Sequence, residues 1–292
     1  ECLECEYCYD LSDLKDTIPK LIRLERFKID TRLDLNLGEN LTRLSSIQSL
    51  RIKARNLAHV TSLTQLKALQ HLLLHVPFLK SLPDFAKREY LRDLILTVLT
   101  LINTIPNLGS LKCLRYLHFE NTPNINHFPL GIENLVNLEY LWFHQYGVNT
   151  YHFDSKGIKG INELKKLKSL ILEGMPIKRL DLDFKKLQVL YEMTIQLEKL
   201  ESLSINNFTE LHCLYLSQCS NLSKMSLDID RLTNLQVLLI EAPKLFFEIS
   251  FQNLKQLKRI TFRNIHQIKR FPNTLAEISS LRDFTINSAK QL

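Results

Sequence analysis

The chain has 292 residues, of which 45% are hydrophobic and 24% are charged, and its formal net charge is +7. These are ordinary figures for a folded, soluble protein, and they argue against intrinsic disorder. The apolar runs are short and interrupted by charged residues, so none approaches the roughly eighteen consecutive residues of a transmembrane helix.

Apolar residues recur with one spacing along most of the chain. Segment 111–143 contains the pattern twice, first as Leu111, Leu114, Leu117 and Phe119 and again as Leu135, Leu138, Leu141 and Phe143. From Phe27 to Leu141, the first apolar residue of each predicted strand follows the previous one after about 22 to 24 residues. A stride of this length with the pattern LxxLxxLxL is typical of leucine-rich repeats. One repeat cannot bury its own leucines, so the repeats must stack into a solenoid.

The repeats predict an α/β solenoid of about 12 turns in one elongated domain, residues 17–292. In each repeat, a short strand with a buried leucine pair is followed by a turn or short helix that returns the chain. We expect strands at 26–30, 49–53, 71–75, 93–97, 116–120, 140–144, 169–173, 213–217, 237–241, 259–263 and 283–287. Residues 1–16 do not fit the repeat and are predicted to form a lead-in or an imperfect cap.

Two stretches depart from the regular spacing. Between Leu141 and Leu170 the interval is longer and contains three of the seven glycines, which predicts a loop inserted near residues 145–162. Between residues 175 and 208, three apolar pairs each suit a strand: Leu180/Leu182, Met193/Ile195 and Leu203/Ile205. Because these pairs are only about ten residues apart, either short irregular repeats pack there or one pair is a turn.

The six cysteines are too few and too unevenly placed for the disulfide framework of a secreted scaffold. Cys2, Cys5 and Cys8 stand three residues apart, but no fourth ligand follows at a distance that suits a metal site. We therefore predict free thiols in the N-terminal segment, no bound metal or other cofactor, and an intracellular, cytoplasmic location.

Motifs for phosphate binding and zinc proteolysis, such as GxxxxGK(S/T), GxGxxG and HExxH, are absent from the sequence. Cys8-Tyr9-Asp10 has the Cys-x-Asp spacing of bacterial repeat-containing ubiquitin ligases. Those enzymes carry a separate helical catalytic domain, for which this chain has no room, and a cysteine nucleophile also needs a positioned base. We therefore predict no catalytic residues and no enzymatic activity.

The repeats resemble those of plant intracellular disease-resistance receptors and of the related Ras-scaffold class, as in LKCLRYLHFENTPNINHFPLGIENLVNLEYL and LHCLYLSQCSNLSKMSLDIDRLTNLQVLLI. The resemblance extends from about Ile18 to Ile286. It implies a horseshoe with a parallel sheet on its concave face and short helices or turns on its convex face. It also implies recognition of another protein, as in the immune receptors of plant defence. The Lys-, Asn- and Ile-rich composition suits, as an alternative, a bacterial effector that acts on a host protein.

Successive side chains of a strand point to opposite faces, so the residues between and beside the leucines should line the concave face. There we predict one aromatic patch on two adjacent strands and a basic field at the N-terminal end, both suited to a partner protein. With further histidines and a tyrosine on the same face, the predicted binding residues are Tyr116, His118, Tyr140, Trp142, His144, His71, His75, Arg26, Lys28, Arg51, Lys53 and Tyr215. The basic residues keep nucleic-acid binding open as an alternative.

Overall fold

The computed structural model describes residues 1–10, 12–37, 40–58, 63, 65–86, 88–145, 153–154, 157–182, 186–205, 208–227, 231–246, 251–267 and 273–287. The chain forms two compact units. Unit 1 consists of Glu1–Leu138 with Gln145–Thr150, and unit 2 consists of Glu139–His144 with Tyr151–Leu292. Each unit builds its own run of parallel strands.

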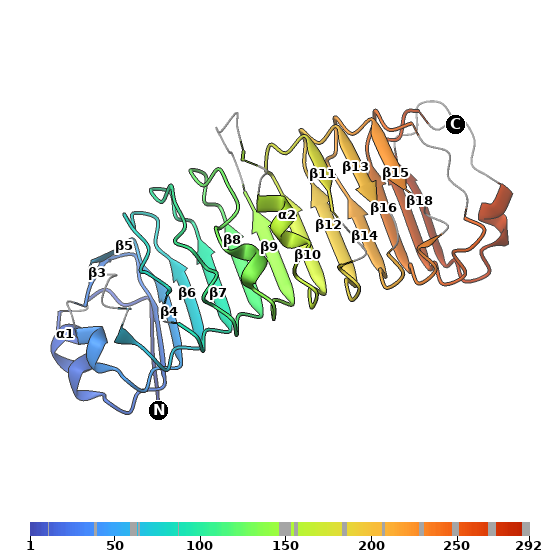
Figure 1. The fold of residues 1–292 in the computed structure, drawn as a ribbon. Helices are drawn as coiled ribbons and strands as arrows, with labels where there is room; N and C mark the ends of the chain where they lie inside the picture. Colours follow the sequence, from blue (N-terminus) through green and yellow to red (C-terminus); the bar gives the residue numbers. More distant parts are fainter. Residues whose placement is uncertain are drawn as a thin grey trace. The chain divides into compact units, whose positions relative to one another are not determined.

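In the described part of unit 1, six parallel strands pair in the order β1-β2-β4-β6-β7-β8 (Figure 1). Their bounds are β1 (Cys2–Glu6), β2 (Arg26–Asp30), β4 (Ser49–Lys53), β6 (His71–His75), β7 (Asp93–Thr97) and β8 (Tyr116–Glu120). The return segments carry a small parallel sheet of β3 (Asp34–Asn36) and β5 (Asn56–Ala58). They also carry short helices: α1 (Leu14–Thr17), η1 (Ile18–Lys20), η2 (Asn40–Arg43) and η4 (Ile132–Asn134).

In the described part of unit 2, seven strands follow in the order β9-β10-β12-β14-β16-β17-β18. They are β9 (Tyr140–His144), β10 (Ser169–Glu173), β12 (Glu192–Gln196), β14 (Cys213–Leu216), β16 (Val237–Glu241), β17 (Arg259–Arg263) and β18 (Asp283–Asn287). A second parallel sheet lies on the return segments and contains β11 (Arg179–Asp181), β13 (Ser202–Ile205) and β15 (Lys224–Leu227). The short helices are α2 (Ile158–Ile161) and η7 (Asn273–Glu277).

The leucine ladder forms the core of each unit. From β2 to β17, the second and fourth residues of the main strands are buried, as in β2, where Phe27 and Ile29 are each 1% exposed. In the end strands β1 and β18 these positions are partly exposed. Parallel pairing keeps these positions in register, so that Phe27 lies beside Leu50 and Leu50 beside Leu72. The first, third and fifth residues face the opposite way, onto the surface that we call the open face. The parallel-strand solenoid predicted from the repeats is confirmed.

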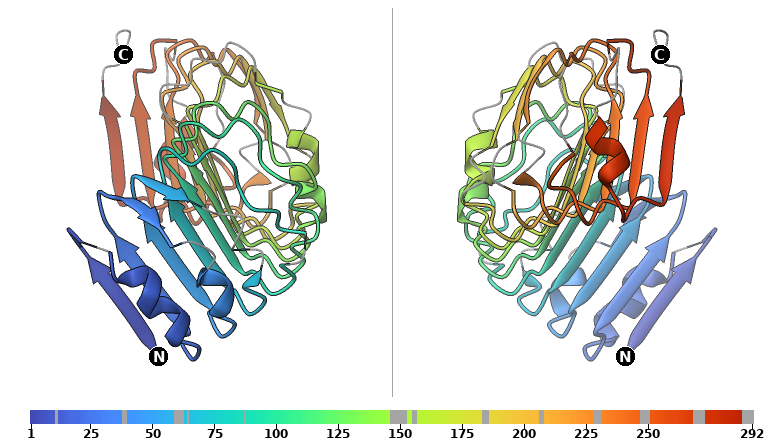
Figure 2. Two further views of the ribbon diagram at one scale, coloured as in Figure 1. Left: turned by 90° about the vertical axis from the view of Figure 1, so that its left-hand side faces the viewer. Right: turned by 90° about the vertical axis from the view of Figure 1, so that its right-hand side faces the viewer.

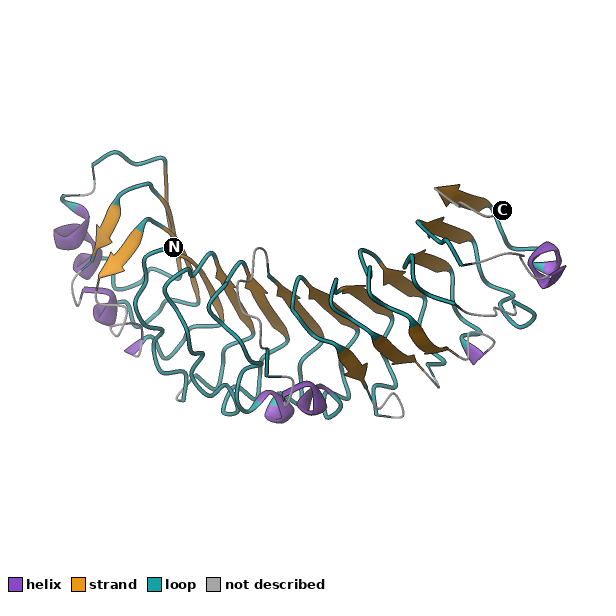
Figure 3. Ribbon diagram, turned by 90° about the horizontal axis from the view of Figure 1, so that it is seen from above, coloured by secondary structure: helices purple, strands orange, loops and turns teal. Residues whose placement is uncertain are grey.

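Besides strand pairing, hydrogen bonds before the strands and on the return segments also join neighbouring turns of the solenoid. Just before the strands, backbone amides donate to the preceding turn, as Gln70 N does to Gln48 O (2.8 Å) and Arg92 N to Gln70 O (2.7 Å). On the return segments, the side-chain amide of Asn137 donates to Lys112 O (2.7 Å). Each turn therefore satisfies backbone groups of its neighbour. Figure 2 views this stacking from β1 in unit 1 and from β18 in unit 2, and Figure 3 shows the short helices on the side away from the main strands.

The backbone enters the left-handed region directly after several main strands. Tyr7, Val98, Asn121 and Asn264 follow β1, β7, β8 and β17 with φ values of 56, 53, 50 and 51°, and Gly174 follows β10 with 74°. Glycine and asparagine tolerate this region, whereas a β-branched residue such as Val98 is strained there. The same turn leads the chain out of the sheet in successive repeats, which explains the asparagines found after predicted strands.

The stretch between residues 175 and 208, which had two open interpretations, contains strands of two different sheets. Met193 of β12 pairs with Leu170 of β10 in the main sheet. Leu180 and Leu203 lie on β11 and β13 and pair with each other in the second sheet. The regular stride is therefore kept, because each repeat in this region carries a strand in both sheets.

The N-terminal segment, which does not fit the sequence repeat, contributes β1, and this strand pairs with β2 so that Cys5 lies beside Ile29. The prediction of free thiols is wrong for Cys5 and Cys8, which form a disulfide with their Cα atoms 6.2 Å apart. The left-handed Tyr7 turns the chain after β1 and brings the two cysteines within bonding reach. Cys2 is a free thiol.

Most of the loop predicted near residues 145–162 lies outside the described residues. Its described part includes α2, which buries Ile158 and Ile161 (4% and 0% exposed). Among the described residues, no helix has the length and the apolar composition needed to span a bilayer.

Candidate functional site

On the open face of unit 1, the strand register arranges side chains in three rows. The first row is Cys2, Arg26, Ser49, His71, Asp93 and Tyr116, and the middle row is Glu4, Lys28, Arg51, Leu73, Ile95 and His118. The third row is Glu6, Asp30, Lys53, His75, Thr97 and Glu120. Because paired strands lie about 4.8 Å apart, neighbours in a row are within contact distance of each other.

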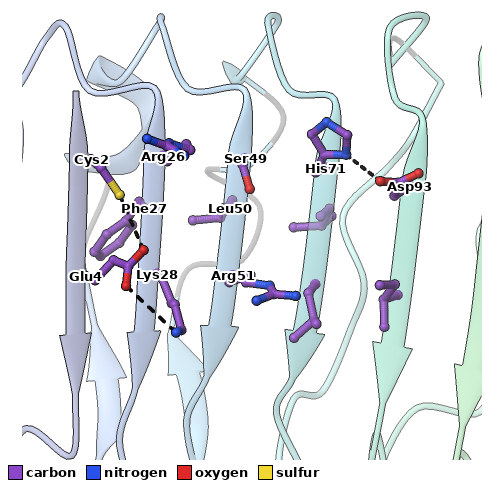
Figure 4. Close-up of a pocket in the computed structure, with 13 residues that line it drawn as sticks. Cys2, Glu4, Arg26, Phe27, Lys28, Ser49, Leu50, Arg51, His71 and Asp93 are labelled. Atoms are coloured by element: carbon purple, nitrogen blue, oxygen red, sulfur yellow. Dashed lines mark hydrogen bonds and ion pairs between the residues drawn. The ribbon is translucent and has the colours of Figure 1, made fainter.

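A groove of about 280 Å³, here called the open-face groove, runs across β1, β2, β4, β6 and β7 (Figure 4). Beyond β4 the middle of the groove is apolar, because Leu73 and Ile95 take the middle positions of β6 and β7, while His71 and Asp93 line its edge. In Figure 4 the guanidinium group of Arg51 reaches toward the strand that carries His71. Four of the predicted binding residues line the groove: Arg26, Lys28, Arg51 and His71.

The predicted basic field is partly neutralised by carboxylates on neighbouring strands. Lys28 forms ion pairs with Glu4 (3.9 Å) and with Glu6, and the hydrogen bond to Glu6 raises the pKa of its ammonium group. On the third row, Lys53 pairs with Asp30 at 3.1 Å. Both lysines therefore already have anionic partners within the protein.

Arg26 and Arg51 differ from the two lysines. Both are exposed, both line the open-face groove, and within the described residues neither forms an ion pair. A guanidinium group presents five donors in a planar fork that matches a carboxylate. An acidic side chain that enters the groove would therefore meet donors from two adjacent strands that no carboxylate of the described chain occupies.

The two predicted histidines on β6 contact residues of β7. His71 Nδ1 meets the carboxylate of Asp93, and His75 Nδ1 lies 3.0 Å from Thr97 Oγ1. Burial lowers the pKa of His75 below its ordinary value of 6.5, and the charge of Lys53 lowers it further. Within the described residues, no three His, Cys, Asp or Glu side chains gather as metal ligands would.

The lowered pKa of His75 predicts a pH-dependent stability. Below pH 6.5 the unfolded chain takes up a proton at this residue that the folded chain does not, so stability falls as the pH drops toward the folded pKa. The carboxylates of Glu120 and Asp30 raise the pKa of His75, but burial and Lys53 outweigh them, so the pKa is lowered on balance. Urea unfolding at about pH 7.5 and about pH 5.5 should show a smaller loss for His75→Gln than for the wild type. An equal loss in both proteins would contradict the assignment.

The two predicted residues on β8 differ in accessibility. Tyr116 is half-buried, and burial raises the pKa of its phenol. His118 is 7% exposed, and its ring meets Tyr116 edge-on with the ring centroids 6.2 Å apart. A partner would therefore contact Tyr116 directly, whereas His118 supports the surface from behind.

On β9 in unit 2, Tyr140 is 42% exposed and Trp142 is half-buried, whereas His144 is 8% exposed. The His144 ring stacks with Trp142 at 21° between the ring planes, and His144 Nδ1 lies 3.0 Å from a carboxylate oxygen of Glu173. This contact fixes His144, while Tyr140 and Trp142 offer the accessible surface. Because β8 and β9 belong to different units, the single contiguous aromatic patch stays a prediction.

Tyr215 lies in the middle row of unit 2, beside Leu239 of β16. Burial, helped by the neighbouring Cys213, raises the pKa of Tyr215 to about 12, so its phenol stays protonated. The same row contains Trp142 and Ile171 on β9 and β10. From β9 to β16 the middle row of unit 2 is therefore mostly apolar, with Thr194 between Ile171 and Tyr215, whereas β17 and β18 place threonines there.

Sequence reasoning missed two parts of the open-face groove. It did not identify β1, which supplies the carboxylates that pair with Lys28, although Leu3 and Cys5 stand one repeat length before Phe27 and Ile29. The repeat pattern also puts Leu73 on this face, but an aliphatic residue there carries no sequence signal that separates a binding wall from ordinary surface.

Similar proteins were found through structure alone. Neither the protein-family models nor the curated protein sequences gave a match. The internalin InlF of Listeria monocytogenes aligns with a TM-score of 0.63 and 13% identity over 99% of this chain and 80% of that chain. TLR13, from its complex with ssRNA13, aligns with a TM-score of 0.54 and 19% identity, covering 99% of this chain and 54% of that chain.

The ectodomain of the receptor kinase GASSHO1/SCHENGEN3 from Arabidopsis thaliana, solved with CASPARIAN STRIP INTEGRITY FACTOR 2, aligns with a TM-score of 0.52 and 18% identity. The alignment covers 93% of this chain and 34% of that chain. At these identities the similarity concerns the fold. Together with the parallel register and the buried leucine ladder, it shows that the chain has the leucine-rich repeat fold.

Proposed function

We propose that the chain is a non-catalytic recognition module that binds a partner protein on its open face. From β2 to β17, the fold uses the second and fourth residues of each main strand for packing, and it directs the alternate side chains to the open face. Repetition of this arrangement produces a long array of side chains whose identity the core does not restrict. Such an array supports binding more readily than it supports catalysis.

The open-face groove is the observation that carries the proposal. Arg26 and Arg51 form no ion pair within the described residues, and Leu73 and Ile95 supply an apolar wall beside them. Arginine is enriched among binding hot spots, which lie in well-packed pockets from which water is excluded. The groove therefore suits a partner segment that carries an acidic side chain next to an aliphatic or aromatic one.

Unit 2 supplies a second contact region on its own open face. Tyr140 is exposed at the first position of β9, and Trp142, Ile171 and Tyr215 lie in the middle row. Rigid aromatic side chains bury much area with little loss of conformational entropy. This row favours an apolar partner surface and complements the more polar groove of unit 1.

The narrower proposal, an intracellular recognition domain of the plant disease-resistance type, rests on the sequence phrases of the repeats. The bacterial-effector alternative rests on composition alone. The disulfide between Cys5 and Cys8 weighs against a cytoplasmic location, because structural disulfides are rare there. The broader proposal, partner binding through the open face, does not depend on this choice.

A peptide library tests the proposal without knowledge of the natural partner. Peptides displayed on phage are selected on the immobilised chain, and their affinity is then measured by fluorescence anisotropy. We expect peptides in which Asp or Glu stands next to Leu, Ile or Phe. For groove-binding peptides, Arg51→Ala should weaken affinity about tenfold or more, and Trp142→Ala should do so for peptides that bind unit 2.

Arg23→Ala is the matched control, because it removes the same charge from an exposed position outside the groove. It should change affinity less than about twofold. Selected peptides that bind both Arg51→Ala and Trp142→Ala like the wild type would exclude the open face as the binding site. Tight binding of oligonucleotides at low salt that is lost in Arg51→Ala would favour the nucleic-acid alternative.

A further inference from the structure

A second groove lies away from the open face, on the return segments of unit 2. It has a volume of about 640 Å³ and is formed by β11, β13, β15 and the turns beside them. We call it the side-sheet groove. Five cationic side chains and one carboxylate line it: Lys178, Arg179, Lys199, Lys224, Lys244 and Glu201.

The second sheet explains why these charges gather on one surface. Leu180 and Leu203 are 0% and 2% exposed, so the alternate positions of β11 and β13 face outward. The register places Arg179 beside Ser202 and Ser202 beside Lys224. With a strand spacing of about 4.8 Å, Arg179 and Lys224 start about 10 Å apart with a small hydroxyl residue between them.

Part of this charge is already paired within the chain. Lys178 lies 3.5 Å from Glu201, and both side chains are largely exposed. Lys244 Nζ donates a hydrogen bond to Asn221 Oδ1 at 2.6 Å.

The other three cations, Arg179, Lys199 and Lys224, form no ion pair within the described residues, and all three are exposed. Unpaired cations on neighbouring turns make the local electrostatic potential positive. This potential attracts a ligand that carries several negative charges along its length.

The other lining groups restrict the chemistry of that ligand. None of the described residues that line the side-sheet groove is aromatic, so this described lining offers no platform on which bases could stack. Glu201 places a carboxylate among the cations, where it pairs with Lys178. Its oxygens accept hydrogen bonds, and a phosphodiester backbone has no donor to offer them. An extended peptide instead offers amide N–H donors to the oxygens of Glu201 and Asn221, and it presents alternate side chains to the cations.

We propose that the side-sheet groove binds an extended acidic segment of a partner protein, through Arg179, Lys199 and Lys224. This surface is separate from the open face, so it adds a contact region whose requirements differ from those of the open face. The open-face groove combines cations with an aliphatic wall, whereas the side-sheet groove recognises charge and backbone hydrogen bonds.

The test uses a fluorescein-labelled peptide of about eight residues in which Glu alternates with Ser, a length that spans the turns of the groove. A peptide in which Gln replaces Glu and a single-stranded oligothymidylate of similar length serve as the comparison probes. The groove variant is Arg179→Gln/Lys199→Gln/Lys224→Gln. The matched control, Lys165→Gln/Lys255→Gln/Arg282→Gln, removes the same charge from exposed positions outside the groove.

We expect the Glu peptide to bind the wild-type chain more tightly than either comparison probe. The groove variant should weaken this binding about tenfold or more, and the control variant less than about twofold. Equal loss in both variants would mean that net charge alone attracts the peptide, and unchanged binding to the groove variant would place the site elsewhere. Tighter binding of the oligothymidylate, lost in the groove variant, would replace the acidic peptide with a nucleic acid. Each of these three results overturns the proposal.

Binding on the open face and binding in the side-sheet groove can be tested independently of each other. Arg51→Ala and Trp142→Ala leave the side-sheet groove intact, and the groove variant leaves the open face intact. Circular dichroism of all variants should match the wild type, because every substituted side chain in the groove and control variants is exposed.

Discussion

Leu74→Ala should lower the free energy of unfolding by about 3 kcal/mol, whereas Leu73→Ala, at the adjacent position of β6, should lower it by about 1 kcal/mol or less. Leu74 is 0% exposed and lies between Ile52 and Leu96 in the register of the leucine ladder. Its truncation leaves a cavity between rigid neighbours in addition to the lost burial of its methyl groups. Leu73 is half-buried on the open face and can be truncated without creating an enclosed void.

The pair is informative because residue type, strand and chemical change are identical, so the two variants differ only in the face to which the side chain points. Urea unfolding followed by circular dichroism measures both free energies. Equal losses would mean that both faces of the sheet are packed, and this would remove the physical basis of a free binding surface. A larger loss for Leu73→Ala would place the core on the other face.

Gly131→Ala is expected to destabilise the protein by roughly 2–4 kcal/mol, from two causes that act together. Gly131 has φ of 79°, in the left-handed region that disfavours a side chain. A Cβ atom there would also collide with Asn107 Oδ1 and would lie 2.6 Å from the backbone nitrogen of Gly109. The two turns cannot easily separate, because Leu108 N donates to Leu130 O at 2.9 Å next to the contact.

Gly109→Ala is the control for this prediction. The added Cβ would lie 3.0 Å from Asn107 Oδ1, 3.1 Å from Asn134 Nδ2 and 3.3 Å from the Cα of Gly131, all longer than the contacts at Gly131. The backbone of Gly109 also does not have a positive φ. Its loss of stability should be about 1 kcal/mol. Thermal or urea unfolding measures the free energy of unfolding of both variants. Similar losses for Gly131→Ala and Gly109→Ala would show that the neighbouring turns are less closely packed than the contacts at Gly131 indicate.

The sequence pattern was sufficient for most strands of the main sheet, although not for β1 or β12. The strand predicted at 71–75 is β6, and Leu72 and Leu74 are its buried residues, because the spacing of the leucines follows directly from the alternation of side chains along a strand. The same reasoning placed Arg26 and Arg51 on the open face. The periodicity predicts toward which face of the sheet a side chain points, because this direction depends only on the position of the residue within its own repeat.

Contacts between repeats could not be predicted in the same way. The pairing of Lys28 with Glu4 and Glu6 depends on β1, whose short apolar pattern was too weak to identify as a strand. The burial of His118 and His144 depends on the size of side chains on adjacent strands rather than on their own spacing. The Cys5–Cys8 disulfide depends on the left-handed turn at Tyr7, for which the sequence carries no signal that distinguishes it from an ordinary loop.

The side-sheet groove escaped prediction for a related reason. The second strands of the repeats, such as β11 and β13, are three and four residues long, and their apolar residues were equally compatible with turns. Without the register of that sheet, Arg179 and Lys224 are two unrelated surface cations that stand 45 positions apart in the sequence. The fold brings them onto one surface.

The most direct measurement compares stability and peptide affinity in one variant, Arg26→Ser/Arg51→Ser/Leu73→Ser/Ile95→Ser, which removes the polar donors and the apolar wall of the open-face groove together. We predict that this fourfold variant unfolds cooperatively, is more stable than Leu74→Ala, and binds the selected peptides at least about tenfold more weakly than the wild type. Wild-type affinity in the fourfold variant, or a stability below that of Leu74→Ala, would contradict the division of the repeat into a packed face and a binding face.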